Sequence, residues 1–226
     1  MPTEFTPQQR FTNRAGDYAR CRPSYPEAAL EELTHAGVLQ AGFHVADLGS
    51  GTGILTRMLL DRAALVYAVE PNEAMRRAAE RDLSPHPNFR SIAGSAEQAT
   101  LPGASVHLVT AGQAIHWFDL SAARQEMQRI LQPGGNAAIL FNDRDLAAST
   151  FMREYEDLLL RHAPEYQRVR SRYLGKDDYT KLFGGQHFQF MHFPNAQVFD
   201  FEGLCGRVLS SSYIPAEGQP GHQELL

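Results

Sequence analysis

The chain has 226 residues, of which 43% are hydrophobic and 21% are charged, and its formal net charge is −5. The length suits one large α/β domain or one domain with a lid. No apolar run is long enough to cross a bilayer, and the N-terminus lacks the basic and apolar stretches of a secretory signal. The acidic balance argues against broad nucleic-acid binding. Because Cys21 and Cys205 make no disulfide framework, we expect a cytoplasmic, reduced protein without membrane or nucleic-acid partners.

Strand and helix patterns alternate from the start of the chain to about residue 144. The expected helices cover residues 27–37, 54–63, 72–83 and 121–131, and the expected strands cover residues 43–49, 65–71, 88–97, 104–118 and 136–144. The stretch QPGG at residues 132–135 is predicted to be a turn. This order predicts a Rossmann-like, doubly wound α/β fold, a mostly parallel sheet with helices on both faces. Ligands bind such sheets beyond the carboxyl ends of the strands.

A glycine-rich turn separates the first strand from its helix. In the stretch VADLGSGTG, Gly49, Gly51 and Gly53 allow a ligand to approach the main chain, because glycine has no Cβ and tolerates positive φ. Ile54 stands where the dinucleotide pattern G-x-G-x-x-G has its third glycine. Asp47 is a poor neighbour for a pyrophosphate, but it suits a cationic or hydrogen-bond-donating ligand.

An acidic residue, Glu70, ends the second strand. A carboxylate there can accept hydrogen bonds from both hydroxyls of a ribose. The two motifs together predict a ligand that has a ribose and whose other end is not a phosphate.

These motifs resemble those of class I S-adenosylmethionine-dependent methyltransferases: VADLGSGTG and VYAVEPN resemble the first two motifs, and GSAEQATLP resembles the third. The segments AGQAIHWFD and YARCRPSYP are similar to the small-molecule branch that includes trans-aconitate methyltransferase-like and methyltransferase type 11 proteins. The resemblance implies S-adenosyl-L-methionine as the cofactor. It also implies methyl transfer to a small-molecule acceptor, which we expect at oxygen, with a carboxylate as one candidate.

The resemblance implies particular residues at the cofactor. Asp47 would face the amino group of the methionine moiety, Glu70 would hold the ribose, and Arg22 would be available to the methionine carboxylate. The cofactor residues that the resemblance implies are Tyr18, Arg22, Asp47, Gly49, Ser50, Gly51, Gly53, Glu70, Pro71, Asn72, Ser95, Ala96, Glu97 and Gln113.

The resemblance and the element pattern together divide the chain into four parts. Residues 1–26 are expected to form an N-terminal arm over the cofactor site, residues 27–144 the S-adenosylmethionine-binding core, and residues 145–186 a helical lid insertion. Residues 187–226 are expected to return to the core with a strand and a helix, and the alternation at residues 188–201 predicts the strand. In the resembled fold an antiparallel strand ends the sheet, so we expect a truncated C-terminus.

Two aromatic residues and an arginine series are candidates for the acceptor side. His116 is the candidate general base, because imidazole titrates near neutral pH; the alternative is that it packs the pocket floor. Trp117 is expected to form a wall beside the substrate or the sulfonium, or to pack in the core. Arg168, Arg170 and Arg172 suit an anionic substrate, against the alternative of a solvated helix face. No metal-binding set is expected.

Two other functions remain open at the level of the sequence. The first is a non-catalytic protein that binds S-adenosylmethionine or S-adenosylhomocysteine. The second is an NAD-dependent oxidoreductase, which the glycine spacing and Asp47 disfavour. Methylation of nucleic-acid bases is disfavoured because no D/N-P-P-Y/F stretch follows the fourth strand and no basic stripe is present. The identity of the acceptor and the oligomeric state cannot be derived from the sequence.

Overall fold

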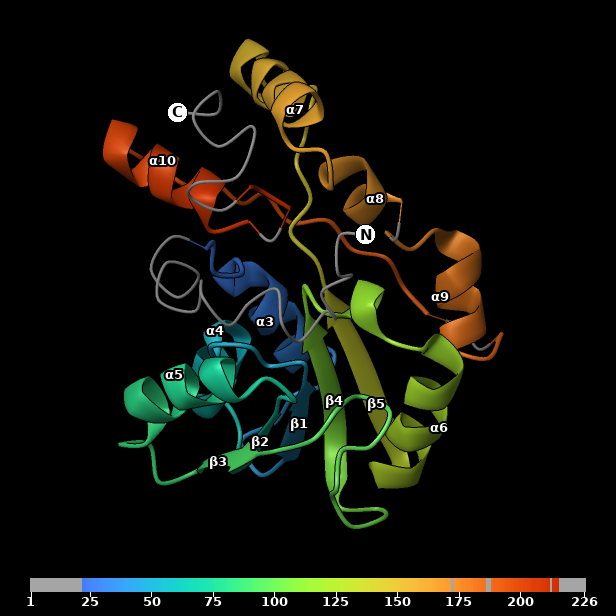
Figure 1. Ribbon diagram of the computed structural model, residues 1–226. Helices are drawn as coiled ribbons and strands as arrows, with labels where there is room; N and C mark the ends of the chain where they lie inside the picture. Colours follow the sequence, from blue (N-terminus) through green and yellow to red (C-terminus); the bar gives the residue numbers. More distant parts are fainter. Residues whose placement is uncertain (1–21, 172, 186–187, 212, 216–226) are drawn as a thin grey trace, which may run out of the picture.

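The computed structural model describes residues 22–171, 173–185, 188–211 and 213–215. At its centre lies a five-stranded sheet in the order β3-β2-β1-β4-β5, in which every neighbouring pair is parallel (Figure 1). The strands are β1 (His44–Leu48), β2 (Leu65–Val69), β3 (Phe89–Ile92), β4 (Val106–Gly112) and β5 (Leu131–Leu140). This arrangement confirms the predicted Rossmann-like, parallel sheet.

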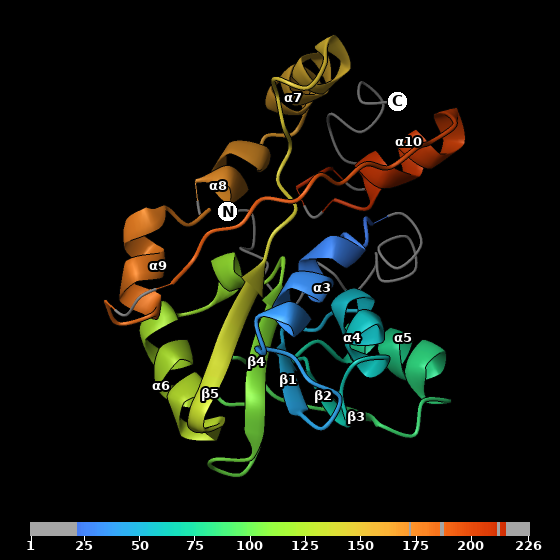
Figure 2. The same cartoon turned by 180° about the vertical axis from the view of Figure 1, so that it is seen from behind.

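Helices cover both faces of the sheet because side chains alternate between the two faces along each strand. Val45 of β1 packs with the helices on one face, and its neighbour Ala46 packs with those on the other. The first face is covered by α3 (Glu27–His35), α4 (Ile54–Leu60) and α5 (Glu73–Leu83), and the second by α6 (Leu120–Ile130) and α9 (Lys176–Leu182) (Figure 2). The doubly wound architecture is therefore confirmed.

The start of β5 differs from the expected turn at residues 132–135. Leu131 already pairs with Val106 of β4, and Asn136 pairs with Leu108, so the register shifts between these two pairs. The extra residues of β5 are accommodated as an irregularity within the ladder, with Gly134 at a φ of +80°. The prediction of a separate turn was wrong because glycine signals a bulge as readily as a turn.

The chain after β5 forms four helices among the described residues. These are α7 (Thr150–His162), α8 (Tyr166–Arg170), α9, and α10 (Phe201–Leu209). Figure 1 shows that α7, α8 and α10 lie beyond the end of the sheet to which β4 and β5 point. None of the described helices has the length and apolar character that crossing a bilayer requires.

The strand predicted at residues 188–201 is wrong. Residues 188–200 form no strand; Figure 2 shows them as an open path from α9 to α10, and Phe201 begins α10. Phe190, Met191 and Val198 are exposed, and no described strand pairs with this segment. Alternation predicts a strand only where a partner strand supplies hydrogen bonds and a core to cover one face.

Gly53 shows how the turn after β1 constrains the fold. It stands at the N-cap of α4 with a φ of +85°, and a Cβ there would lie 2.5 Å from Cδ1 of Leu83. We predict that Gly53→Ala lowers the free energy of unfolding by roughly 2–5 kcal/mol, because left-handed φ and overpacking both oppose it. Denaturant unfolding would measure the loss.

Substitutions at two other glycines would separate the effect of left-handed φ from that of overpacking. Gly134 has a φ of +80° but open space around a Cβ, so Gly134→Ala should cost only about 1–2 kcal/mol. Gly42 has open space and no positive φ, so Gly42→Ala should change stability by less than about 0.5 kcal/mol. Equal losses in all three variants would contradict this account.

Candidate functional site

Two adjoining cavities lie at the carboxyl ends of β1, β2 and β4. Including the space that is open to solvent, they have volumes of about 450 Å³ and about 800 Å³. The two cavities share four of their lining residues, Gly49, Gly51, Gly112 and Gln113, so they meet over the glycine-rich turn. The first cavity extends towards Asp47 and Arg22, and the second extends towards Glu70 and Ser95. An elongated ligand with different chemistry at its two ends fits this division.

Asp47 is a buried carboxylate at the wall of the first cavity. It lies on β1, where it pairs with Thr110 of β4, and it is only 1% exposed. Its Oδ1 accepts a hydrogen bond from Oγ1 of Thr110 at 2.9 Å, and its Oδ2 accepts one from Oγ1 of Thr56 at 2.7 Å. Burial raises the pKa of Asp47 to about 6, although these two hydroxyls lower it, and the charge of Glu70 raises it further. The ionised form therefore gains from a cation in the cavity.

Two hydroxyls in the same wall have unused hydrogen-bonding capacity. Oγ of Ser50 and Oγ1 of Thr52 are buried and have no hydrogen-bond partner within the part of the chain that the structure describes. Both residues line the first cavity. Because buried polar groups are almost always hydrogen-bonded, these hydroxyls indicate a polar ligand group at this end.

Glu70 joins the turn after β1 to the turn after β2 in the second cavity. Its Oε2 accepts a hydrogen bond from the main-chain N–H of Gly51 at 2.9 Å, and its Oε1 accepts one from the N–H of Asn72 at 2.8 Å. Each oxygen can accept a further hydrogen bond, and Glu70 lines the second cavity. Burial raises the pKa of Glu70, while these N–H groups and the charge of Arg76 lower it. The carboxylate is thus held in place with acceptor capacity to spare.

The glycine turn has the space that the sequence predicts. A Cβ on Gly49 would lie 2.7 Å from Cβ of Ala114, which leaves no room for a side chain. Gly51 has a φ of +58° and no atom within 4 Å of a Cβ, so a side chain there would project into open space. Since Gly51 lines both cavities, that open space is where a ligand would cross the turn.

The structure brings most of the predicted cofactor residues together. Gly53 lines neither cavity but caps α4, and Tyr18 lies outside the described residues. Those that line the two cavities are Arg22, Asp47, Gly49, Ser50, Gly51, Glu70, Pro71, Asn72, Ser95, Ala96, Glu97 and Gln113. Lining residues absent from the predicted set include Thr52, Gly112 and Phe118; Thr52 and Gly112 lie next to predicted residues in the chain, which was the available signal.

The side-chain amide of Gln113 is engaged with the main chain of Asn142. Its Nε2 donates to the carbonyl of Asn142 at 3.2 Å, and its Oε1 accepts from the N–H of Asn142 at 2.7 Å. Its φ is +54°, an uncommon value for a residue other than glycine. Such outliers cluster at functional sites, where the surrounding structure stabilises them.

His116 and Trp117 differ in their placement. Both lie in the short 3₁₀ helix η1 (Ile115–Trp117), and Trp117 lines the second cavity. His116 lines neither cavity; its ring lies 4.8 Å from that of Trp117, 5.5 Å from that of Tyr173 and 5.8 Å from that of Phe141. The structure therefore places Trp117 at the site and His116 in an aromatic cluster beside it.

The described arginines of the predicted series differ in their surroundings. Arg170 forms an ion pair with Glu156, Arg168 is exposed on α8, and Arg172 lies outside the described residues. Among the described residues, no group of three or more His, Cys, Asp or Glu side chains could hold a metal ion.

The parallel sheet, the left-handed glycine turn and the acid at the end of β2 together define a Rossmann-like protein that binds a nucleoside-containing ligand. Residues 46–139 match the methyltransferase domain family. An uncharacterized methyltransferase-like protein of Schizosaccharomyces pombe is 31% identical over 226 residues, which cover 95% of this chain and 84% of that protein. The chain belongs to the class I S-adenosylmethionine-dependent methyltransferase family.

Other relatives agree with this placement. An uncharacterized methyltransferase of Mycobacterium tuberculosis is 39% identical over 135 residues, which cover 60% of this chain and 53% of that protein. The matched part of the chain thus spans about half the length of these curated relatives. A candidate type II methyltransferase from Anaeromyxobacter dehalogenans has a TM-score of 0.60 and 27% identity, and the match covers 90% of this chain and 86% of that structure.

S-adenosylmethionine, the cofactor of this family, fits the residues that are present. Its ammonium group suits Asp47, its carboxylate suits the buried hydroxyls of Ser50 and Thr52, and its ribose suits Glu70. The open space over Gly51 admits the portion that joins the two ends.

The pKa of Asp47 makes a prediction about stability. Since this pKa is about 6 in the folded protein, against an ordinary value of 3.8, the contribution of Asp47 to stability is complete below about pH 4 and is lost as the pH rises through 6. Asparagine does not titrate. The unsubstituted chain should therefore lose up to about 3 kcal/mol of its free energy of unfolding between about pH 4 and pH 7, a loss that Asp47→Asn does not share. The free energy of unfolding of Asp47→Asn minus that of the unsubstituted chain should increase by the same amount.

Denaturant unfolding across this pH range would measure the difference. Asp61→Asn, at an exposed position after α4, is the matched control. A difference between Asp47→Asn and the natural chain that is the same at every pH would contradict the raised pKa.

Proposed function

We propose that this chain transfers the methyl group of S-adenosylmethionine to a small-molecule acceptor at oxygen. The observation that supports the proposal best is the pair of adjoining cavities that meet over Gly51, with Asp47 in the wall of one and Glu70 in the wall of the other. Two buried carboxylates on either side of a glycine turn match a ligand with an amino acid at one end and a ribose at the other.

Each residue has a defined part in this proposal. Glu70, which Gly51 and Asn72 hold in place, accepts the ribose hydroxyls. Asp47, ionised above its pKa of about 6, accepts a hydrogen bond from the ammonium group. When bound, the cofactor supplies an electrophilic methyl group on a sulfonium, so the protein has mainly to position the acceptor and exclude water. Trp117 and Phe118 contribute apolar surface to the wall of the second cavity.

The acceptor chemistry is supported by a relative rather than by the site. The malonyl-[acyl-carrier protein] O-methyltransferase of Serratia marcescens is 31% identical over 135 residues, which cover 57% of this chain and 51% of that protein. Its name specifies transfer to oxygen. A carboxylate acceptor would be ionised at neutral pH and would need no general base.

Glu70→Gln tests the cofactor site. We predict that it weakens binding of S-adenosylhomocysteine by at least about tenfold, because an ionised acceptor of two hydroxyl hydrogen bonds is replaced by a neutral amide. Isothermal titration calorimetry measures the affinity. Glu73→Gln is the matched control, since Glu73 is exposed one turn away and pairs with Arg77 at the surface.

The same titration separates the alternatives. Unchanged affinity in Glu70→Gln would remove the site assignment. Binding of NADH without binding of S-adenosylhomocysteine would favour an oxidoreductase. Tight cofactor binding without methyl transfer to any acid of a broad acceptor panel would favour a non-catalytic binder.

His116→Phe tests the candidate base. The phenyl ring keeps the packing against Trp117 and Tyr173 but cannot carry a proton. If His116 is the base, turnover falls by about a hundredfold or more while the affinity for S-adenosylhomocysteine stays the same. Methyl transfer from labelled cofactor measures turnover. Unaltered turnover would assign the imidazole to packing, in agreement with an acceptor that arrives ionised.

A further inference from the structure

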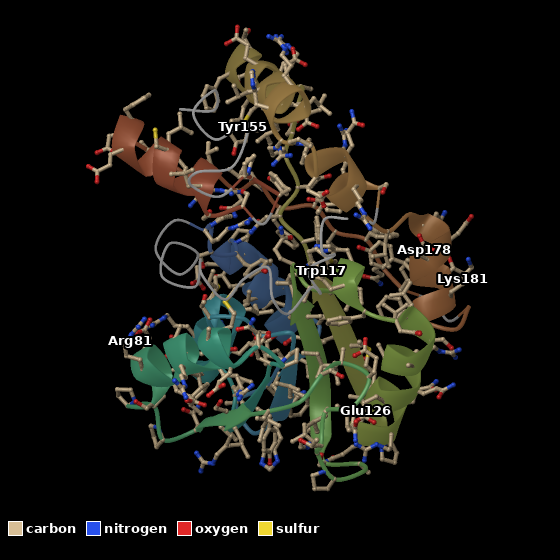
Figure 3. All side chains as sticks on the ribbon, viewed as in Figure 1. Arg81, Trp117, Glu126, Tyr155, Asp178 and Lys181 are labelled. Carbon is tan, nitrogen blue, oxygen red and sulfur yellow. The ribbon has the colours of Figure 1, made fainter. Side chains whose placement is uncertain are left out.

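The helices after β5 enclose a second polar cluster, which the cofactor site does not use. Its apolar frame includes Tyr155 and Leu159 of α7, Tyr166 of α8, Val208 of α10 and Tyr213. Figure 3 labels Tyr155 on the part of α7 that faces α10. Four arginines from separate parts of the chain, Arg22, Arg144, Arg170 and Arg207, approach this frame.

One carboxylate in the cluster is fully engaged. Glu156 forms ion pairs with Arg144, at 3.0 Å, and with Arg170. Its two oxygens also lie 2.8 Å and 2.7 Å from Oη of Tyr166. The acceptor capacity of Glu156 is therefore used by two guanidinium groups and one hydroxyl, and it is not directed to any other cation.

Arg207 has no such carboxylate. Its Nη1 donates to Oγ of Ser211 at 3.3 Å, and it forms no ion pair within the described part of the chain. Burial lowers the pKa of Arg207, and the positive charge of Arg22 lowers it further. A partly buried guanidinium beside a like charge is unfavourable unless an anion joins it.

Tyr155 provides the second, independent observation. Tyr155 is only 8% exposed, and its Oη has no hydrogen-bond partner among the residues that the structure describes. Burial and Tyr213 raise the pKa of Tyr155, while the charges of Arg207, Arg144 and Arg22 lower it, so all three cations act on this hydroxyl. A buried hydroxyl without a partner, next to cations, is a ready donor to an anion.

The cluster adjoins the cofactor site through Arg22. Arg22 lines the cavity that contains Asp47 and Gly49, and its Nη2 donates to the carbonyl of Ser210, directly after α10, at 3.2 Å. The cationic cluster therefore borders the end of the site that suits the methionine portion of the cofactor.

We propose that Arg207 and Tyr155 bind a carboxylate of the methyl acceptor and so orient it towards the cofactor cavity. The inference rests on the proposed function, and it specifies the acceptor as an anionic small molecule with at least one carboxylate. The guanidinium supplies a fork of N–H donors and Tyr155 supplies an O–H donor to the same group. Arg22 and Arg144 add positive potential around it.

Thermal denaturation of the S-adenosylhomocysteine-saturated chain with small carboxylates tests the inference. Acetate, succinate and tricarballylate are titrated at constant ionic strength, with their amides and inorganic phosphate as comparisons. We expect the carboxylates, and not the amides, to raise the melting temperature. Arg207→Gln and Tyr155→Phe should each weaken the apparent carboxylate affinity by about tenfold or more.

Two controls keep the test independent of folding. Tyr155→Phe removes only a hydroxyl that has no partner in the described part of the chain, so its melting temperature without ligand should not fall. Arg161→Gln changes an exposed arginine on the same helix and should keep the full carboxylate response. No response to any carboxylate, or an equal response to phosphate, would overturn the inference.

A second titration, with S-adenosylhomocysteine alone, distinguishes the acceptor from the cofactor. Weaker S-adenosylhomocysteine binding in Arg207→Gln would show that the cluster serves the cofactor carboxylate, which overturns the inference. The carboxylate titration is repeated without S-adenosylhomocysteine. If S-adenosylhomocysteine does not bind but the carboxylates still raise the melting temperature, the proposed function fails while the anion site stands. If S-adenosylhomocysteine binds but no carboxylate raises the melting temperature, the anion site alone is overturned.

Discussion

The candidate cofactor site depends on two hydrogen bonds that the Glu70 carboxylate accepts from the main chain. Their donors are the N–H groups of Gly51, in the turn after β1, and of Asn72, the N-cap of α5. Glycines at positive φ gain no support from their own side chains, so the carboxylate fixes the turn from outside. Burial raises its pKa, which is the electrostatic cost of this placement. The group that orders the turn is also the group that we propose binds the ribose, so the proposal links loop geometry to ligand recognition.

The burial of Asp47 has a second electrostatic cost. Its pKa is raised by burial and also by the charge of Glu70, so the site holds two carboxylates that disfavour each other's ionisation. The hydroxyls of Thr56 and Thr110 offset part of this cost. A ligand with an ammonium group would offset more of it, which explains why a fold would keep both acids buried at one sheet edge.

The sequence predicted those features that local patterns determine. The strands, the glycine turn, Asp47 and Glu70 belong to short motifs, and the parallel sheet brings strand ends to one edge. The sequence could not place His116 relative to the two cavities, because its packing against Phe141 and Tyr173 depends on chain segments far along the sequence. The strand at residues 188–201 failed because its alternation has no described partner strand. The cluster at Arg207 and Tyr155 was missed because no spacing rule links α7 to α10.

The two cavities and the neighbouring cluster of arginines have opposite electrostatic character, and this difference has a mechanistic consequence for the proposed function. At the sheet edge, Asp47 and Glu70 favour a cationic ligand. Around α7 and α10, Arg207 and its neighbouring arginines favour an anion. A sulfonium cofactor would be stabilised at the cavities and a carboxylate acceptor at the cluster, and their own attraction would draw the reacting atoms together. Since methyl transfer joins a nucleophilic oxygen to an electrophilic carbon, such a field would align both reactants before any proton has to move.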